Sequence, residues 1–114
     1  MTFAEYGAAV EKFARYPGVD HNLVYPALKL CGEAGEIAEK VGKLWRDTGR
    51  KAGENLTADE REGLLKELGD VLWYINALAS LELDSSLDEV AALNIEKLTS
   101  RHERGTLAGS GDDR

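Results

Sequence analysis

An all-α fold is predicted by three observations on this chain of 114 residues. Three Ser/Thr-x-x-Glu capping boxes mark helix starts, because the hydroxyl accepts from a backbone N–H and the Glu carboxylate reaches back. Apolar side chains recur at three- and four-residue steps through two long segments, which gives each segment a wide apolar stripe. No stretch alternates apolar and polar residues as a half-buried strand does. We therefore expect a four-helix, bundle-like domain.

The four helices are expected at residues 3–15, 25–47, 58–82 and 87–104. The first, third and fourth begin at the capping boxes Thr2/Glu5, Thr57/Glu60 and Ser86/Glu89. Pro26 suits the first turn of the second helix, where its missing N–H is no loss. Glycines that follow the periodic segments, Gly49 and Gly105 among them, indicate helix ends. The apolar stripe of the second helix includes Cys31 and Trp45, which we expect in the core.

Length and net charge limit the functions that the chain can have. Its 114 residues correspond to one domain, which we place at 1–104, with a flexible tail at 105–114. The net charge of −7 argues against a protein that coats a nucleic-acid polymer, since phosphate neutralisation needs a basic face. One cysteine excludes an internal disulfide. No apolar run has membrane-helix length and no signal peptide is evident, so a cytoplasmic protein is expected.

A short acidic motif occurs twice. Glu33-Ala-Gly-Glu36 in the second helix matches Glu67-Leu-Gly-Asp70 in the third, position by position. On helical wheels, the two acids of each motif lie on an equivalent flank beside the apolar stripe. If the two helices pack as an antiparallel hairpin, the four carboxylates can converge. The plainer interpretation is a solvated helix face, which is how most acids spaced i, i+3 are used.

Converging carboxylates require a cation. At an effective dielectric constant of about 20, two like charges about 6 Å apart repel by roughly 3 kcal/mol. Oxygen ligands without Cys or His select a hard cation, Mg²⁺ or Mn²⁺. The duplicated motif therefore predicts a magnesium site that would take its remaining ligands from substrate phosphates.

The paired motif, with Lys66 before its second half and Asp70-Val-Leu-Trp73-Tyr74 continuing it, resembles the signature of the MazG-like nucleotide pyrophosphohydrolases. These belong to the all-α nucleoside-triphosphate pyrophosphatase superfamily. Asn94-Ile-Glu-Lys97-Leu with Arg101 is similar to the family's fourth-helix segment, and the glycine-rich ending is similar to tails of its small members. The resemblance covers roughly residues 20–114. The connection from Glu36 to Lys66 is long for the family.

The resemblance implies Mg²⁺-dependent hydrolysis of a nucleoside triphosphate between its α- and β-phosphates, with Mn²⁺ as an alternative metal. It implies that Glu33, Glu36, Glu67 and Asp70 are the catalytic metal ligands, and one acid of the second helix would accept the proton of the attacking water. The expected substrate-binding residues are Asn94, Lys97, Arg101, Tyr74, Lys66, Trp73 and His21. For several of these, an ordinary surface or core role is an equally simple interpretation.

Two alternatives remain open at this point. A related helical fold hydrolyses another phosphoanhydride, of the phosphoribosyl-ATP type, so the substrate is not fixed. A non-catalytic helical interaction module would carry the same acids as plain surface. Because a chain of this size has limited core, and because the family shares its pocket between subunits, we expect a homo-oligomer, a dimer or a tetramer.

Overall fold

The structure is a computed structural model that describes residues 1–49 and 55–111. Its elements are α1 (Phe3–Glu11), α2 (Val24–Thr48), α3 (Ala58–Asn76), the π-helical turn η1 (Ala77–Glu82) and α4 (Leu87–Glu103). No strand occurs in the described residues, so the all-α prediction is confirmed. None of the helices in this part of the chain combines the length and the apolar character needed to cross a bilayer.

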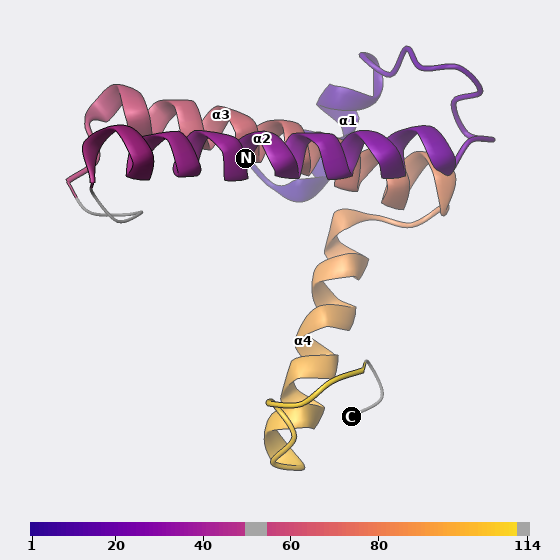
Figure 1. Cartoon of the computed structure of the whole chain (residues 1–114). Coiled ribbons are helices and arrows are strands. Elements are labelled where there is room, and N and C mark those ends of the chain that lie inside the picture. Colours follow the sequence, from indigo (N-terminus) through magenta and orange to yellow (C-terminus); the bar gives the residue numbers. More distant parts are fainter. Residues whose placement is uncertain (50–54, 112–114) are drawn as a thin grey trace.

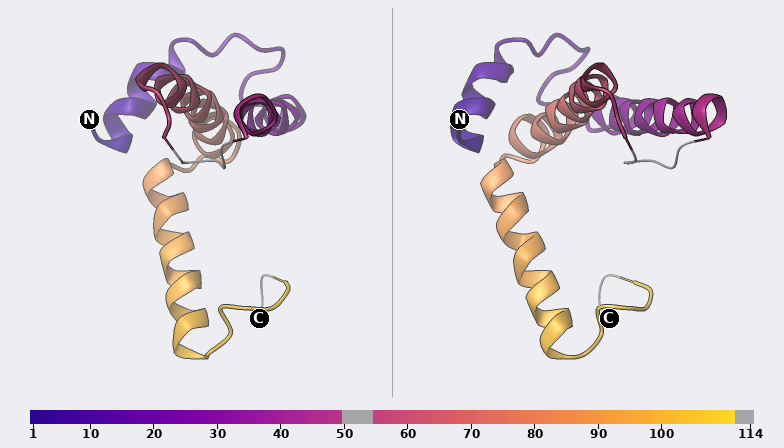
Figure 2. Two further views of the ribbon diagram at one scale, coloured as in Figure 1. Left: turned by 60° about the vertical axis from the view of Figure 1, so that its left-hand side comes forward. Right: turned by 90° about the vertical axis from the view of Figure 1, so that its left-hand side faces the viewer.

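Helices α2 and α3 form an antiparallel hairpin, and α1 packs near the end where η1 lies (Figure 1). Helix α4 leaves the hairpin steeply and extends away from it, which both views of Figure 2 show. Its contacts within the protomer are with α1 and η1. The hairpin is therefore the scaffold of the duplicated motif, and α4 is an arm.

Two of the three predicted capping boxes form completely. The Thr2 and Thr57 hydroxyls accept from the N–H of Glu5 and Glu60, and both carboxylates return to the cap residue. At the start of α4 only half of the box forms. The Ser86 hydroxyl accepts from Glu89 N at 3.1 Å, but the Glu89 carboxylate binds the Ser85 hydroxyl instead. The neighbouring serine competes successfully for the carboxylate.

The expected boundaries of α1 and α2 need correction. Helix α1 ends at Glu11 rather than at residue 15, because the N–H of Phe13 turns to the carbonyl of Val10, three residues back. Helix α2 begins at Val24, where the Asn22 side-chain oxygen accepts from Tyr25 N at 3.1 Å. The Asn22 side chain thus satisfies one backbone N–H in the first turn of α2.

The third predicted helix, 58–82, is present as one continuous helical segment, which is α-helical as far as Asn76 and π-helical from Ala77 to Glu82. After Asn76 the backbone widens into η1, and Leu83 N donates to Leu78 O, five residues back, at 3.0 Å. Such π-helical turns are rare in proteins as a whole, and those that occur often lie at functional sites. Helix α2 ends as predicted at Gly49, which adopts a left-handed φ of 67°.

The protomer has a small core. Its buried residues lie where α1, the segment after it, η1 and α4 meet, and they include Tyr16, Ala77, Ala79 and Leu87. The prediction that Cys31 and Trp45 belong to the core is wrong for the protomer, since both are exposed, Trp45 by 65%. The radius of gyration is 16.9 Å, whereas a compact domain of this length has about 13 Å. Much of the apolar stripe is thus uncovered.

The tail folds back on the end of α4 as far as it is described. Thr106 N donates to Arg101 O at 2.8 Å, and the Arg101 guanidinium donates to Gly111 O at 3.2 Å. Residues 112–114 of the tail predicted to be flexible lie outside the described residues.

Candidate metal centre

The hairpin brings three of the four motif acids together. Glu33 from α2 and Glu67 and Asp70 from α3 each offer one carboxylate oxygen, and these oxygens lie within 4.8 Å of one another. We call these three residues the acidic cluster. The spacing of the motif explains the convergence, since the same flank of each helix turns toward the other in the antiparallel pair. Oxygen-only donors at this separation fit a hard divalent cation.

Glu36, the fourth motif acid, is exposed and lies outside this cluster. It sits three residues beyond Glu33, on the part of the α2 surface turned farthest from the apolar stripe. The structure therefore separates the four acids into three that share a site and one beside them.

Two lysines lie against the acidic cluster. Lys40 Nζ is 2.5 Å from Glu67 Oε1, and Lys29 Nζ is 3.5 Å from Glu33 Oε1. The two glutamate side chains are only 12% and 14% exposed, whereas both lysine side chains are 45% exposed. The ammonium groups reduce the repulsion among the carboxylates.

A hollow of about 460 Å³ opens beside the cluster. We call it the aromatic hollow. Two cluster acids, Glu33 and Asp70, form part of its wall. The rest of the lining comes from the α1–α2 connection (residues 12–23), from α2 and from α3: Phe13, Arg15, Tyr16, Tyr25, Trp73 and Tyr74. Cation ligands and flat π-surfaces are therefore adjacent.

The aromatic rings of this hollow support one another. Tyr16 stacks on Tyr25 with ring centroids 5.2 Å apart, and its edge meets Trp73 at 6.4 Å. Trp73 also meets Tyr74 edge to face at 4.8 Å. Offset and edge-to-face pairs of this kind hold rings in fixed orientations. Trp73, one of the expected substrate-binding residues, lines this hollow.

Tyr74 remains a hydrogen-bond donor at neutral pH. Burial raises the pKa of its phenol, and the nearby Glu33 and Asp70 raise the pKa further, although Lys29 opposes them. The Lys29 ammonium lies 5.9 Å from the Tyr74 ring centroid. A protonated phenol and an ammonium thus face the same side of the cluster.

Other predicted substrate residues lie elsewhere. His21 is exposed and pairs with Asp20 at 2.8 Å. Lys66 pairs with Glu62 at 2.7 Å on the outer face of α3. Neither residue lines the aromatic hollow.

The three substrate residues predicted on α4 are also separate from the acidic cluster within the protomer. Asn94 and Lys97 line a hollow of about 320 Å³ with Val90 and Leu93. Arg101 is buried at the end of α4, where the tail covers it. The structure therefore brings Trp73 and Tyr74 to the acids and leaves Asn94, Lys97 and Arg101 on the arm.

Four lining residues were missed by sequence reasoning: Phe13, Arg15, Tyr16 and Tyr25. Residues up to 15 were expected to lie in the first helix, although that segment leaves the helix and folds over the hairpin. The signal available was the run Arg15-Tyr16-Pro17-Gly18, in which an aromatic residue precedes a turn.

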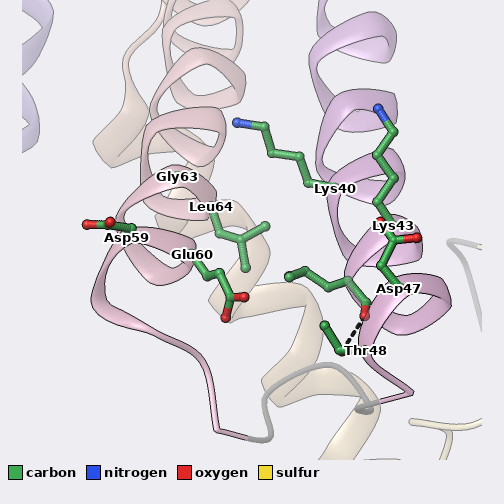
Figure 3. A pocket seen from close by; sticks show the side chains of 9 residues that line it. Lys40, Lys43, Asp47, Thr48, Asp59, Glu60, Gly63 and Leu64 are labelled. Carbon is green, nitrogen blue, oxygen red and sulfur yellow. Dashed lines mark hydrogen bonds between the residues drawn. The ribbon is translucent and has the colours of Figure 1, made fainter.

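A second hollow, of about 530 Å³, lies between the last turns of α2 and the first turns of α3 (Figure 3). Three of its charged residues already serve local structure. Asp47 binds Arg46 at 2.6 Å, Glu60 belongs to the α3 capping box, and Lys43 pairs with Glu39 at 2.8 Å. In the described part of the chain, the acids that could share a metal lie at the aromatic hollow instead. The aromatic hollow is therefore the candidate functional site.

Comparisons with known proteins agree with this geometry. A family model described as the MazG nucleotide pyrophosphohydrolase domain matches residues 25–106, which include the whole acidic cluster. The gene 37 protein of Mycobacterium phage L5 is 45% identical over 114 residues, and the alignment covers 96% of each chain. No solved structure matches. The chain belongs to the MazG nucleotide pyrophosphohydrolase family.

Proposed function

We propose that the protein is a divalent-metal-dependent nucleoside triphosphate pyrophosphohydrolase. It cleaves an NTP or dNTP between the α- and β-phosphates and releases a nucleoside monophosphate and pyrophosphate. The observation that carries this proposal is the convergence of three carboxylates within 4.8 Å of one another, two of which form part of the wall of the aromatic hollow. Membership of a pyrophosphohydrolase family supports the reaction class.

Glu33, Glu67 and Asp70 would hold the metal, with Mg²⁺ as the expected ion and Mn²⁺ as a substitute. A divalent ion at such a site offsets phosphate charge and lowers the pKa of an attacking water. One of the two α2 acids would accept the proton of that water: Glu33, which belongs to the acidic cluster, or Glu36, which lies one helical turn farther along α2.

The remaining residues bind and orient the substrate. The Tyr74 phenol donates to a phosphate oxygen, and Lys29 and Arg15 supply positive charge at the rim. Trp73 and Tyr25 offer flat surfaces to a base, and the buried Tyr16 contacts both rings and supports them.

The working enzyme is, in our proposal, a homo-oligomer. The α4 arm carries exposed Leu93 and Ile95, at 59% and 63% exposure, and carries Asn94 and Lys97 between and beside them. A second copy that covers these apolar side chains removes them from water. The same contact delivers Asn94 and Lys97 to the partner's acidic cluster as phosphate ligands.

Pyrophosphate release tests the reaction. The purified protein is assayed with a panel of common and modified NTPs and dNTPs, and with a phosphoribosyl-ATP-type substrate, in the presence of Mg²⁺ or Mn²⁺. Glu33→Gln and Asp70→Asn should each reduce kcat by at least about 100-fold, because each removes a charged metal ligand. Glu39→Gln, which alters an exposed acid of the same helix paired with Lys43, is the matched control and should retain activity.

Full turnover without a divalent cation, or in both cluster variants, would contradict the proposed site. A non-catalytic interaction module would release no pyrophosphate from any member of the panel.

A further inference from the structure

One carboxylate outside the acidic cluster gathers three hydrogen bonds from a single segment. Glu82, the last residue of η1, accepts from the Tyr16 hydroxyl at 2.5 Å and from Asp20 N at 3.0 Å through Oε1. Its Oε2 accepts from Asn22 N at 2.9 Å. All three donors belong to the α1–α2 connection, more than 55 residues away in the chain.

That connection forms one wall of the aromatic hollow. It contributes Phe13, Arg15 and Tyr16, opposite the acids of the hairpin. Tyr16 is only 7% exposed, since its ring is held between Tyr25 and Trp73 while its hydroxyl reaches Glu82. Arg15 is its direct neighbour in the chain and is itself exposed.

Few other bonds fix the course of this segment. Within it, His21 N donates to Gly18 O at 2.8 Å, and the Asn22 side chain donates to Pro17 O at 2.7 Å. Both bonds are internal to the connection and shape its turn. Asn22 also accepts from Tyr25 N in the adjoining first turn of α2. In the described structure, the hydrogen bonds by which residues 16–22 reach an element distant in the chain all end on Glu82.

We propose that Glu82 is a positioning residue that anchors the α1–α2 connection against the hairpin, so that Arg15 and Tyr16 face the acidic cluster. The inference rests on the proposed function, because it assigns these two residues to the binding of the triphosphate substrate. A carboxylate suits this role because both of its oxygens accept hydrogen bonds, so it can bind all three donors. A glutamine at this position would place an NH2 group, which donates and does not accept, against at least one of these donors.

The anchor is tested without any substrate by amide hydrogen exchange. In Glu82→Gln, the N–H groups of Asp20 and Asn22 should exchange about tenfold faster than in the unmodified protein. Asp84→Asn is the matched control, since it removes one exposed negative charge two residues away and asparagine tolerates the left-handed φ of 50° found there. Unchanged exchange at both amides in Glu82→Gln would overturn the proposal.

The consequence for the substrate is tested on the same variants. Glu82→Gln should raise KM for the preferred nucleotide about tenfold and change kcat by less than about threefold, because the acids on α2 and α3 stay in place. Calorimetric binding of Mn²⁺ alone should match that of the unmodified protein. Equal loss of kcat and kcat/KM, or loss of Mn²⁺ binding, would show that the substitution damages the hairpin and would overturn the positioning role.

Tyr16→Phe provides an independent route, because it keeps the stacked ring and removes one bond of the anchor. The exchange effects of Tyr16→Phe and Glu82→Gln should be less than additive in the double variant, since both break the same contact. Additive effects would contradict the anchor. If the unmodified protein released no pyrophosphate, the proposed function would fail while the exchange measurements would still decide whether Glu82 holds the connection.

Discussion

At the scale of single residues, the acidic cluster is a balance between carboxylates and two ammonium groups. Glu67 and Glu33 each lie against a lysine, at 2.5 Å and 3.5 Å. A divalent cation bound by the same oxygens must compete with these lysines and is repelled by them. In the proposed metal site, Lys40 and Lys29 would therefore weaken the affinity of the cluster for a cation.

Lys40→Gln should raise the affinity for Mn²⁺ several-fold, because it removes a positive charge that competes for Glu67. The variant without metal should lose up to about 1 kcal/mol of stability, as expected for a partly exposed ion pair. Calorimetric titration and thermal melting measure the two effects. Lys43→Gln, whose lysine pairs with Glu39 instead, should show neither effect, and weaker Mn²⁺ binding in Lys40→Gln would refute the competition.

Glu82 also predicts a pH dependence of stability. The Tyr16 hydroxyl, followed by the N–H groups of Asn22 and Asp20 and the nearby His21, holds the pKa of Glu82 below its usual value of 4.5. The ionised form is thus favoured in the folded protein, and its stabilising contribution is complete above about pH 4.5 and disappears as the pH falls through the lowered pKa.

The melting temperature of Glu82→Gln should therefore lie below that of the unmodified protein at neutral pH, and the gap should close as the pH falls through the lowered pKa of Glu82. Thermal melts followed by circular dichroism at a series of pH values provide the measurement. A gap independent of pH would mean that the ionised carboxylate is not what holds the segment.

The acidic cluster could be predicted from the sequence because the pattern that specifies it is local. Glu33, Glu67 and Asp70 follow from a repeat and a helical period, and the only further assumption is an antiparallel hairpin. Arg15, Tyr16 and Tyr25 could not be found in this way. Arg15 and Tyr16 lie on the α1–α2 connection, which is bound to Glu82, a residue 66 positions away from Tyr16. Tyr25 lies at the start of α2, and its ring stacks on that of Tyr16.

At the scale of the elements, helix starts with a cap and helix ends with a left-handed glycine were predictable. Thr2, Thr57 and Gly49 act through atoms within four residues, so local sequence determines them. The early end of α1 and the π-helical turn are different, because tertiary contacts decide them. Ser80 and Glu82 of η1 bind Glu11 and Tyr16, respectively, across the fold.

The α3 cap can be tested separately from the site. Thr57→Ala should reduce the free energy of unfolding by about 1 kcal/mol, because it leaves the N–H of Glu60 without its hydroxyl acceptor. Thr57→Ser keeps the hydroxyl and should lose much less. Denaturant unfolding of the three proteins measures the difference, and equal losses in both variants would mean that the hydroxyl is not the stabilising group.

At the scale of the whole molecule, the uncovered apolar side chains are the dominant feature. Leu28, Trp45 and Ile95 are each more than 60% exposed, on three different parts of an extended protomer. Contiguous exposed apolar surface commonly marks a protein interface. Within the protomer, Asn94 and Lys97 on α4 lie away from the acidic cluster. In the proposed oligomer, the contact that covers the apolar side chains of α4 also brings these two residues to the acidic cluster of a second copy.

Leu93→Glu should shift the protein toward the monomer, because it places a charge on the apolar face of α4. Turnover should fall with the oligomer, while Mn²⁺ binding to the hairpin persists. Light scattering and calorimetry follow the two properties. Glu96→Gln, which changes charge on the same helix without burying any, is the control, and a monomeric unmodified protein at working concentration would contradict the assembly.

The long separation between Tyr16 and Glu82 also orders events during synthesis. A ribosome adds about 5–20 residues per second, so Tyr16 is made several seconds before the carboxylate that anchors it, 66 residues later. Through that interval the hairpin helices can form, because their contacts are close in sequence, while the N-terminal segment has no partner to close upon. The wall of the aromatic hollow is therefore among the last parts of each new chain to take its shape.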